Sequence, residues 1–286
     1  MSRSKAARRA FAVGVVVVAA VCAVVTPAAA AWPPVFEPSG QELSFYSQPG
    51  VGAPTQTSRL ASSTWEADPT DKPLMCKIWP MTPSALPASF RNGYWTYNID
   101  DSDVGTTSNI ERFGRPGDTP FCGQTTPVDK SMWEQDSLIV WREGVFYFRL
   151  ATQTKAVTFG RPTDTPLIGD WDGDSVDEMA VKRGNRYYFA TDNITGGGGV
   201  RSSTFGLPTD APVTAASLYL NGVDTLVLRR GNRYLFTGDL PGAPTMQITR
   251  EQAYGKATDI PLDVENWVPS DPESRQVSVA RLGPDS

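Results

Sequence analysis

Short runs of alternating apolar and polar residues, rich in β-branched and aromatic side chains, fill most of the chain beyond residue 41. Clusters of Gly, Asn, Asp and Pro separate the runs, and the helical period of about 3.6 residues is absent beyond the N-terminal segment. The pattern therefore predicts an all-β protein. Four such runs lie at 166–169, 178–182, 186–190 and 200–205.

This group of four runs recurs along the chain at intervals of 46 to 49 residues. The sequence FGRPTDTP marks the third copy from Phe159, and related sequences begin at Ala67, Phe113, Phe205 and Tyr254. In each copy an Asp stands two residues ahead of the Pro, where a bond from the side chain to the backbone is typical of a turn. These residues are Asp71, Asp118, Asp164, Asp210 and Asp259.

Four strands in a repeat of about 46 residues are the pattern of a β-propeller blade. The copies occupy 67–112, 113–158, 159–204, 205–253 and 254–286. The last copy holds only two strand candidates, at 262–264 and 276–281, but the runs at 42–47 and 58–65 supply the missing pair. Residues 32–286 are therefore predicted to form one five-bladed propeller, its last blade completed by 42–65, which leaves no open sheet edge. Six or seven blades are the alternative, if the N-terminal runs form extra structure.

A second marker of the repeat is an Arg, which in four of the five copies precedes a turn containing Gly. A hairpin is predicted at each of these turns. Because the Arg recurs in every copy, we expect it to stabilise the blade rather than to recognise an anion. These residues are Arg91, Arg142, Arg183, Arg230 and Arg281.

Residues 1–31 have the features of an export signal: basic residues, an apolar run from Ala10 to Val25, and small residues up to Ala31. Cleavage near Ala31 is expected; the alternative, a membrane anchor, needs roughly 20 apolar residues. Cleavage removes four of the 26 basic residues and none of the 31 acidic ones, which leaves a net charge of −9. We expect a secreted or wall-associated protein with no membrane span after cleavage, and no nucleic-acid partner, because phosphate binding needs clustered Lys and Arg.

Cysteine and histidine content narrows the chemistry further. Only Cys76 and Cys122 remain after the signal, and two cysteines in an exported protein usually form a disulfide. The chain contains no His, which excludes Ser-His and Cys-His nucleophiles and His-liganded zinc. The protein is therefore not expected to be an enzyme.

Carboxylates crowd the segment GDWDGDSVDEMAV at 169–181, where Asp170, Asp172 and Asp174 alternate ahead of Glu178. Alternate carboxylates on a tight loop can converge on one Ca²⁺, which takes six to eight oxygen ligands. Gly173 gives the loop a permissive backbone. A solvated acidic turn without an ion and a carboxylate pair for acid–base catalysis are the alternatives.

Together with the FGxPxDxP turns, this loop resembles the FG-GAP or VCBS repeat family, which occurs in integrin α-chain propellers and in many secreted bacterial proteins. The resemblance covers about 67–281 and implies one structural Ca²⁺, because the corresponding loops of the other copies lack the alternating Asp. Ser175 departs from the family's usual Gly, and Glu replaces its final Asp. The implied ligands are the side chains of Asp170, Asp172, Asp174 and Glu178 and the backbone carbonyl of Val176.

Large aromatic rings usually pack in the core of such blades, but Trp133 and Trp171 are the two that we most expect on the surface, where a flat ring could stack on a sugar. The predicted function is a secreted, non-catalytic binding or adhesion module with one Ca²⁺-stabilised loop. Its predicted ligand is a cell-surface or cell-wall glycan or protein. The alternatives are a carboxylate-dependent enzyme that acts on polysaccharide and a purely structural wall protein.

Overall fold

The computed structural model describes residues 41–47, 58–78, 85–98, 108–125, 136–192, 198–215, 222–262, 265–266, 275–276 and 278–282. Within these ranges the chain forms strands and turns without a helix, as the all-β prediction requires. Among the same residues, no helical segment has the length and apolar character needed to cross a bilayer. The predicted signal, residues 1–31, lies outside the described ranges.

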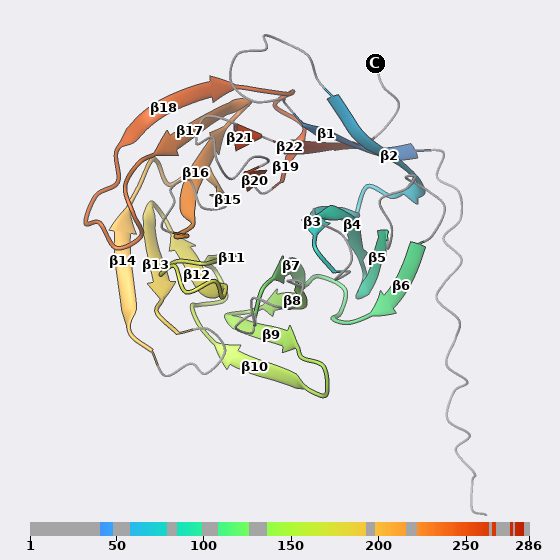
Figure 1. Ribbon diagram of the computed structural model, residues 1–286, viewed down its shortest axis with the longest axis horizontal. Coiled ribbons are helices and arrows are strands. Elements are labelled where there is room, and N and C mark those ends of the chain that lie inside the picture. Colours follow the sequence, from blue (N-terminus) through green and yellow to red (C-terminus); the bar gives the residue numbers. More distant parts are fainter. Residues whose placement is uncertain are drawn as a thin grey trace, which may run out of the picture. The chain divides into compact units, whose positions relative to one another are not determined.

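Four antiparallel sheets of four strands form blades of a β-propeller, and the strands of each blade follow one another along the chain (Figure 1). Blade 1 consists of β3 (Lys72–Cys76), β4 (Leu86–Arg91), β5 (Tyr94–Asn98) and β6 (Ser108–Arg112). Blade 2 consists of β7 (Thr119–Gly123), β8 (Ser137–Arg142), β9 (Val145–Arg149) and β10 (Thr154–Thr158). Blade 3 consists of β11 (Thr165–Gly169), β12 (Glu178–Arg183), β13 (Arg186–Ala190) and β14 (Val200–Thr204). Blade 4 consists of β15 (Ala211–Ala215), β16 (Thr225–Arg230), β17 (Arg233–Thr237) and β18 (Ile248–Ala253). The first strand of each of these four blades is the innermost.

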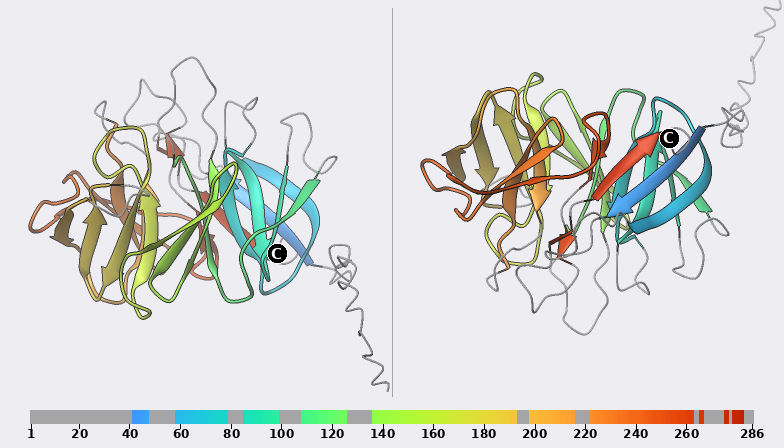
Figure 2. Two further views of the ribbon diagram at one scale, coloured as in Figure 1. Left: turned by 90° about the horizontal axis from the view of Figure 1, so that it is seen from below. Right: turned by 90° about the horizontal axis from the view of Figure 1, so that it is seen from above.

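The two ends of the chain share one further four-stranded sheet, in the order β19-β22-β1-β2. Its strands are β1 (Gln41–Ser47), β2 (Ser58–Ala67), β19 (Ile260–Pro261) and β22 (Ser278–Leu282). Figure 2 shows β1 beside β22, where Phe45 pairs with Ala280, so the predicted pairing between N-terminal and C-terminal strands is confirmed. A two-stranded ladder of β20 (Glu265–Asn266) and β21 (Arg275–Gln276) was not predicted.

The core of the protein lies between neighbouring blades. Phe189 and Leu167 of blade 3 pack in one cluster with Leu226 and Leu228 of blade 4, and all four side chains are buried. Similar clusters fill the spaces between blades 1 and 2 and between blades 2 and 3. Because both faces of a blade are covered, the second strands contain continuous apolar runs such as Leu226–Leu228 instead of strict alternation.

A pair between a buried Asp and a partly exposed Arg recurs in each of the four blades. In blade 3, Asp164 Oδ2 accepts a hydrogen bond from the Arg161 backbone N–H at 2.9 Å, which is the predicted turn bond. Arg183 then donates from Nε to Oδ1 at 2.8 Å and from Nη2 to Oδ2 at 2.7 Å. The equivalent pairs are Asp71–Arg91, Asp118–Arg142 and Asp210–Arg230. The repeated Arg is thus a blade-stabilising residue, as predicted, and its partner is the repeated Asp.

The two hydrogen bonds from the Arg guanidinium to the Asp carboxylate, here called the fork, explain how a charged carboxylate lies in the interior of each blade. Asp164 and Asp210 are buried, and an ionised carboxylate in such a place needs hydrogen-bond donors and an opposite charge. The Arg183 side-chain hydrogen bonds hold the pKa of Asp164 below its usual range, and Arg230 does the same for Asp210. At Asp259 the turn bond is kept, from the Lys256 N–H at 2.8 Å.

A disulfide joins Cys76 at the end of β3 to Cys122 in β7, with the two Cα atoms 5.5 Å apart. It connects the innermost strands of blades 1 and 2, and the predicted bond is confirmed. The cysteines are 46 residues apart, and closing a loop of that length stabilises a protein by about 2–4 kcal/mol.

We expect Arg183→Ala to lower the free energy of unfolding by about 2–3 kcal/mol, because it leaves the buried Asp164 carboxylate with only its turn bond. Arg186→Ala is the matched control, since Arg186 begins the next strand and is exposed. The control should cost less than about 0.5 kcal/mol. Urea unfolding of both variants measures the difference, and equal losses would contradict a special role for the fork.

Candidate metal site in blade 3

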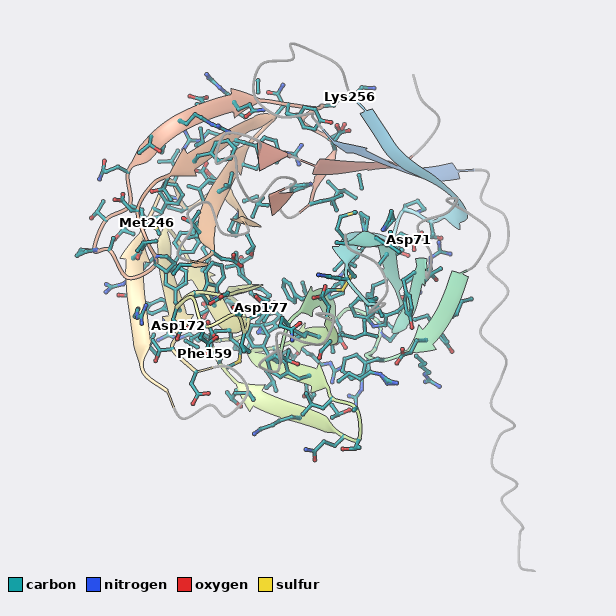
Figure 3. The ribbon with its side chains drawn as sticks, viewed as in Figure 1. Asp71, Phe159, Asp172, Asp177, Met246 and Lys256 are labelled. Atoms are coloured by element: carbon teal, nitrogen blue, oxygen red, sulfur yellow. A yellow bond between two sulfur atoms is a disulfide. The ribbon has the colours of Figure 1, made fainter. Side chains whose placement is uncertain are left out.

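The acidic segment forms the connection between β11 and β12, the two inner strands of blade 3 (Figure 3). Trp171 folds beneath it, 1% exposed, and donates from its ring Nε1 to the Glu178 carbonyl at 3.0 Å. Gly169 permits this, because a Cβ there would lie 2.9 Å from the Trp171 ring. The loop therefore rests on a packed aromatic side chain.

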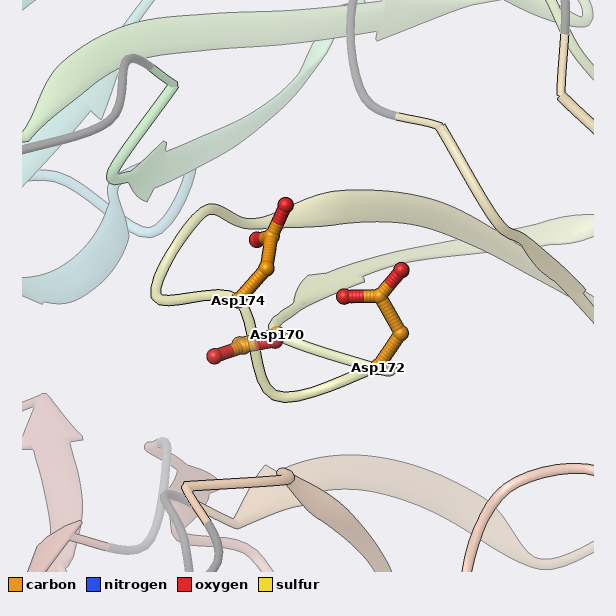
Figure 4. Close-up of side chains that lie close together, drawn as sticks. All are labelled: Asp170, Asp172 and Asp174. Carbon is orange, nitrogen blue, oxygen red and sulfur yellow. The ribbon is translucent and has the colours of Figure 1, made fainter.

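Three of the predicted ligands come together. Asp170, Asp172 and Asp174 each offer a carboxylate oxygen within 4.8 Å of the others (Figure 4). Among the residues that the structure describes, this is the one group of at least three carboxylate or thiol side chains arranged in this way.

Hydrogen bonds within the loop hold two of these carboxylates. Asp170 accepts from the Gly173 N–H at 2.6 Å and from the Ser175 N–H at 2.8 Å, and Asp174 accepts from the Val176 N–H at 2.8 Å. The Oδ1 atom of Asp172 is buried and has no hydrogen-bond partner. A buried carboxylate oxygen without a donor is costly, and a bound cation is the partner that the surrounding acidic groups favour.

Glu178, another predicted ligand, lies behind the loop and is buried. Its Oε2 accepts from the Trp171 N–H at 3.0 Å, and it is not part of the group formed by the three Asp. Burial, together with the nearby charges of Asp172, Asp170 and Asp174, raises the pKa of Glu178 to about 9. The side chain of Val176, whose carbonyl was predicted as a ligand, is 1% exposed and anchors the loop in the core.

The backbone at Ser175 has a conformation for which Gly is the usual residue. Its φ is +69°, in the left-handed region where a side chain is strained. Gly173 also has a positive φ, of +87°, without this cost. The loop keeps the required conformation at Ser175 at the expense of local strain.

The prediction that Trp171 contacts an external ligand is wrong. Its ring is enclosed by the core between blades 3 and 4 and lies 5.2 Å from the Phe189 ring, centroid to centroid. A side chain with 1% exposure offers no face for a sugar. Trp133, the other candidate for a ligand contact, lies outside the described residues.

The sequence analysis missed a second set of acidic residues, which connect neighbouring blades. Asp177 donates from its backbone N–H to the Gln124 carbonyl at 2.6 Å, and its Oδ2 accepts from the Gln124 N–H at 2.6 Å. Asp136 makes the same exchange with Lys77, and Asp224 makes it with Asp170. Each of the three Asp stands six residues ahead of a repeated Arg, and this regular position was the signal that could have identified them.

Asp136, Asp177 and Asp224 lie at the seams, the contacts between neighbouring blades, and they also affect one another electrostatically. Burial raises the pKa of Asp177 well above its usual range, and the charges of Asp224, Asp136 and Asp170 act in the same direction. Figure 3 shows Asp177 on the side of its blade that faces the ring centre. Burial and the neighbouring carboxylates thus favour the neutral form of Asp177.

No protein-family model matches this chain, and a search of curated proteins finds no significant match.

Replacing Ser175 by Gly should raise the free energy of unfolding by about 1 kcal/mol, because it removes the strain of a side chain at positive φ. The same replacement at Ser202, in strand β14, should lower stability by about 0.5–1 kcal/mol, because Gly weakens an extended strand. Urea unfolding of both variants is the measurement. A loss of stability in both would show that the loop conformation is not strained at Ser175.

Proposed function

We propose that this protein is a secreted, non-catalytic β-propeller of the FG-GAP or VCBS type, in which one Ca²⁺ stabilises the inner loop of blade 3. In this proposal the propeller binds a glycan or protein of the cell surface or cell wall. The observation that carries it is the convergence of the Asp170, Asp172 and Asp174 carboxylates, one of which has a buried oxygen without a partner.

We also propose that the sheet β19-β22-β1-β2 is a fifth blade that closes the ring. Two contacts support this. Asp259 forms the same turn bond as the four Asp that begin the other blades. Arg229 of blade 4 donates to the Asp259 carbonyl, just as Lys182 of blade 3 donates to the Asp210 carbonyl at 2.6 Å. The hydrogen bond from the second strand of one blade to the turn that begins the next therefore recurs between blade 4 and the sheet β19-β22-β1-β2.

The residues of the loop fit a hard cation such as Ca²⁺. Carboxylate oxygens are its preferred ligands, and a divalent charge would offset the repulsion among Asp170, Asp172 and Asp174. Glu178 and the carbonyl of Val176 complete the proposed ligand set. We propose a structural role for the ion, because the loop lies between two strands that are already paired along their length.

Calcium should therefore raise the melting temperature of the protein, and EDTA should reverse the effect. With a Kd near 0.1 mM and Ca²⁺ near 1 mM, the stabilisation is about 1.4 kcal/mol. Asp172→Ala should abolish the response, because it removes the carboxylate with the unpartnered oxygen. Glu251→Gln, which removes an exposed carboxylate on β18, is the control that should respond like wild type. An equal response of wild type and Asp172→Ala to Ca²⁺ would contradict the proposed Ca²⁺ site.

One observation favours the alternative, a carboxylate-dependent enzyme that acts on polysaccharide. Asp177 has a raised pKa and lies close to other acidic groups, as catalytic carboxylates often do. The same carboxylate accepts a backbone hydrogen bond from the preceding blade, and Asp136 makes the same contact at another seam. A repeated structural contact accounts for Asp177 without catalysis, so we favour the binding module.

The binding function is tested with an array of glycans and isolated bacterial cell walls, incubated with the purified protein in Ca²⁺ or in EDTA. We expect retention on a surface glycan or wall component and no release of reducing sugar from any polysaccharide. Release of reducing sugar that stops in Asp177→Asn would establish the enzyme instead. Absence of binding to every glycan, wall and surface-protein preparation would favour a purely structural protein.

A further inference from the structure

The first carboxylate of the metal site is held by the neighbouring blade. Asp224, which directly precedes β16 of blade 4, donates from its backbone N–H to the Asp170 carbonyl at 2.7 Å. Its side-chain Oδ2 accepts from the Asp170 N–H at 3.0 Å. Both backbone polar groups of Asp170 are thus fixed by one residue that lies 54 positions further along the chain.

The same part of blade 4 lies against the turn of the acidic loop. A Cβ added to Gly222 would come within 3.7 Å of the Gly173 carbonyl oxygen, so the two backbones are close neighbours. The Gly173 N–H donates to Asp170 Oδ1. The part of the loop that lies against blade 4 therefore also orients the first carboxylate of the proposed metal site.

We propose that Asp224 is a positioning residue for the cation, and that cation binding in blade 3 is therefore coupled to the seam between blades 3 and 4. This inference rests on the proposed Ca²⁺ site. Groups that orient metal ligands without contacting the metal typically change its affinity 10–100-fold when they are removed. Asp224 meets the description, because it fixes the backbone from which the Asp170 carboxylate projects and offers no ligand to the group of three.

Coupling of this kind acts in both directions. If the seam contact favours the loop conformation that binds the ion, the bound ion must stabilise the seam contact by the same free energy. Calcium is therefore expected to slow hydrogen exchange at the Asp170 and Asp224 amides, both of which donate across this seam.

The chain contains a matched control for Asp224. Asp136 precedes β8, donates from its backbone N–H to the Lys77 carbonyl at 2.8 Å and accepts from the Lys77 N–H at 2.7 Å. The geometry is that of the Asp224 contact, but the seam joins blades 1 and 2 and holds no residue of the acidic loop. Loss of Asp136 should therefore weaken the fold to a similar extent without reaching the ion.

Calcium titrations by isothermal calorimetry test the proposal on the full-length protein. We expect Asp224→Ala to raise the Kd for Ca²⁺ 10–100-fold and Asp136→Ala to leave it within about twofold of wild type. Asp224→Asn keeps an oxygen that can accept from the Asp170 N–H, so its Kd should stay within about threefold of wild type. A wild-type Kd in Asp224→Ala, or the same increase in Asp136→Ala, would overturn the inference.

Two further outcomes distinguish failure of the proposed metal site from failure of the coupling alone. If wild type binds no Ca²⁺, the proposed metal site fails and the coupling fails with it; if wild type binds and Asp224→Ala binds equally well, only the coupling fails. Should Asp224→Ala not fold, hydrogen exchange on wild type decides the question. Calcium must then protect the Asp170 and Asp224 amides and leave the Asp136 amide unchanged, and equal rates with and without Ca²⁺ at Asp170 and Asp224 would contradict the proposal.

Discussion

A carboxylate buried under a turn and held by an arginine fork is the contact on which each blade depends. The Asp comes from the turn that enters a blade, and the Arg comes from the end of its second strand. Burial of the carboxylate alone would be unfavourable, but the turn amide and the two guanidinium donors satisfy it together. The turn and the inner hairpin are therefore fixed to each other, and this places the innermost strand against the ring centre.

The seams between blades combine apolar packing with polar contacts that differ around the ring. The backbone exchange made by Asp136 with Lys77 recurs at the seams between blades 2 and 3 and between blades 3 and 4, whereas the disulfide joins blades 1 and 2. Between blades 3 and 4, Lys182 also reaches the turn carbonyls of Pro208 and Asp210. Burial lowers the pKa of Lys182, which the nearby Asp210 opposes. A repeated fold can thus keep its blade geometry while the chemistry of each seam changes, because the buried clusters between the sheets supply most of the contact.

The acidic loop is the place where blade 3 departs from this plan. The connection from its first to its second strand brings the carboxylates of Asp170, Asp172 and Asp174 together at one end of a buried seam. Trp171 and Val176 anchor the loop from below, and Asp224 holds it from the side. Contacts from two sides therefore hold the backbone of the loop in place.

The sequence by itself determined the repeat, the four strands of each blade, the pairing of the two chain ends, the disulfide and the three converging aspartates. Strand alternation, turn residues and a fixed repeat length are local signals, and the same local pattern in every copy requires the same structure. Only the tertiary structure decided that the repeated Asp and Arg are partners, that the Trp171 ring is buried, and that Asp224 holds Asp170. These contacts join residues about 20 to 54 positions apart or depend on which face of a loop packs inward, and neither is encoded in the local spacing of residue types.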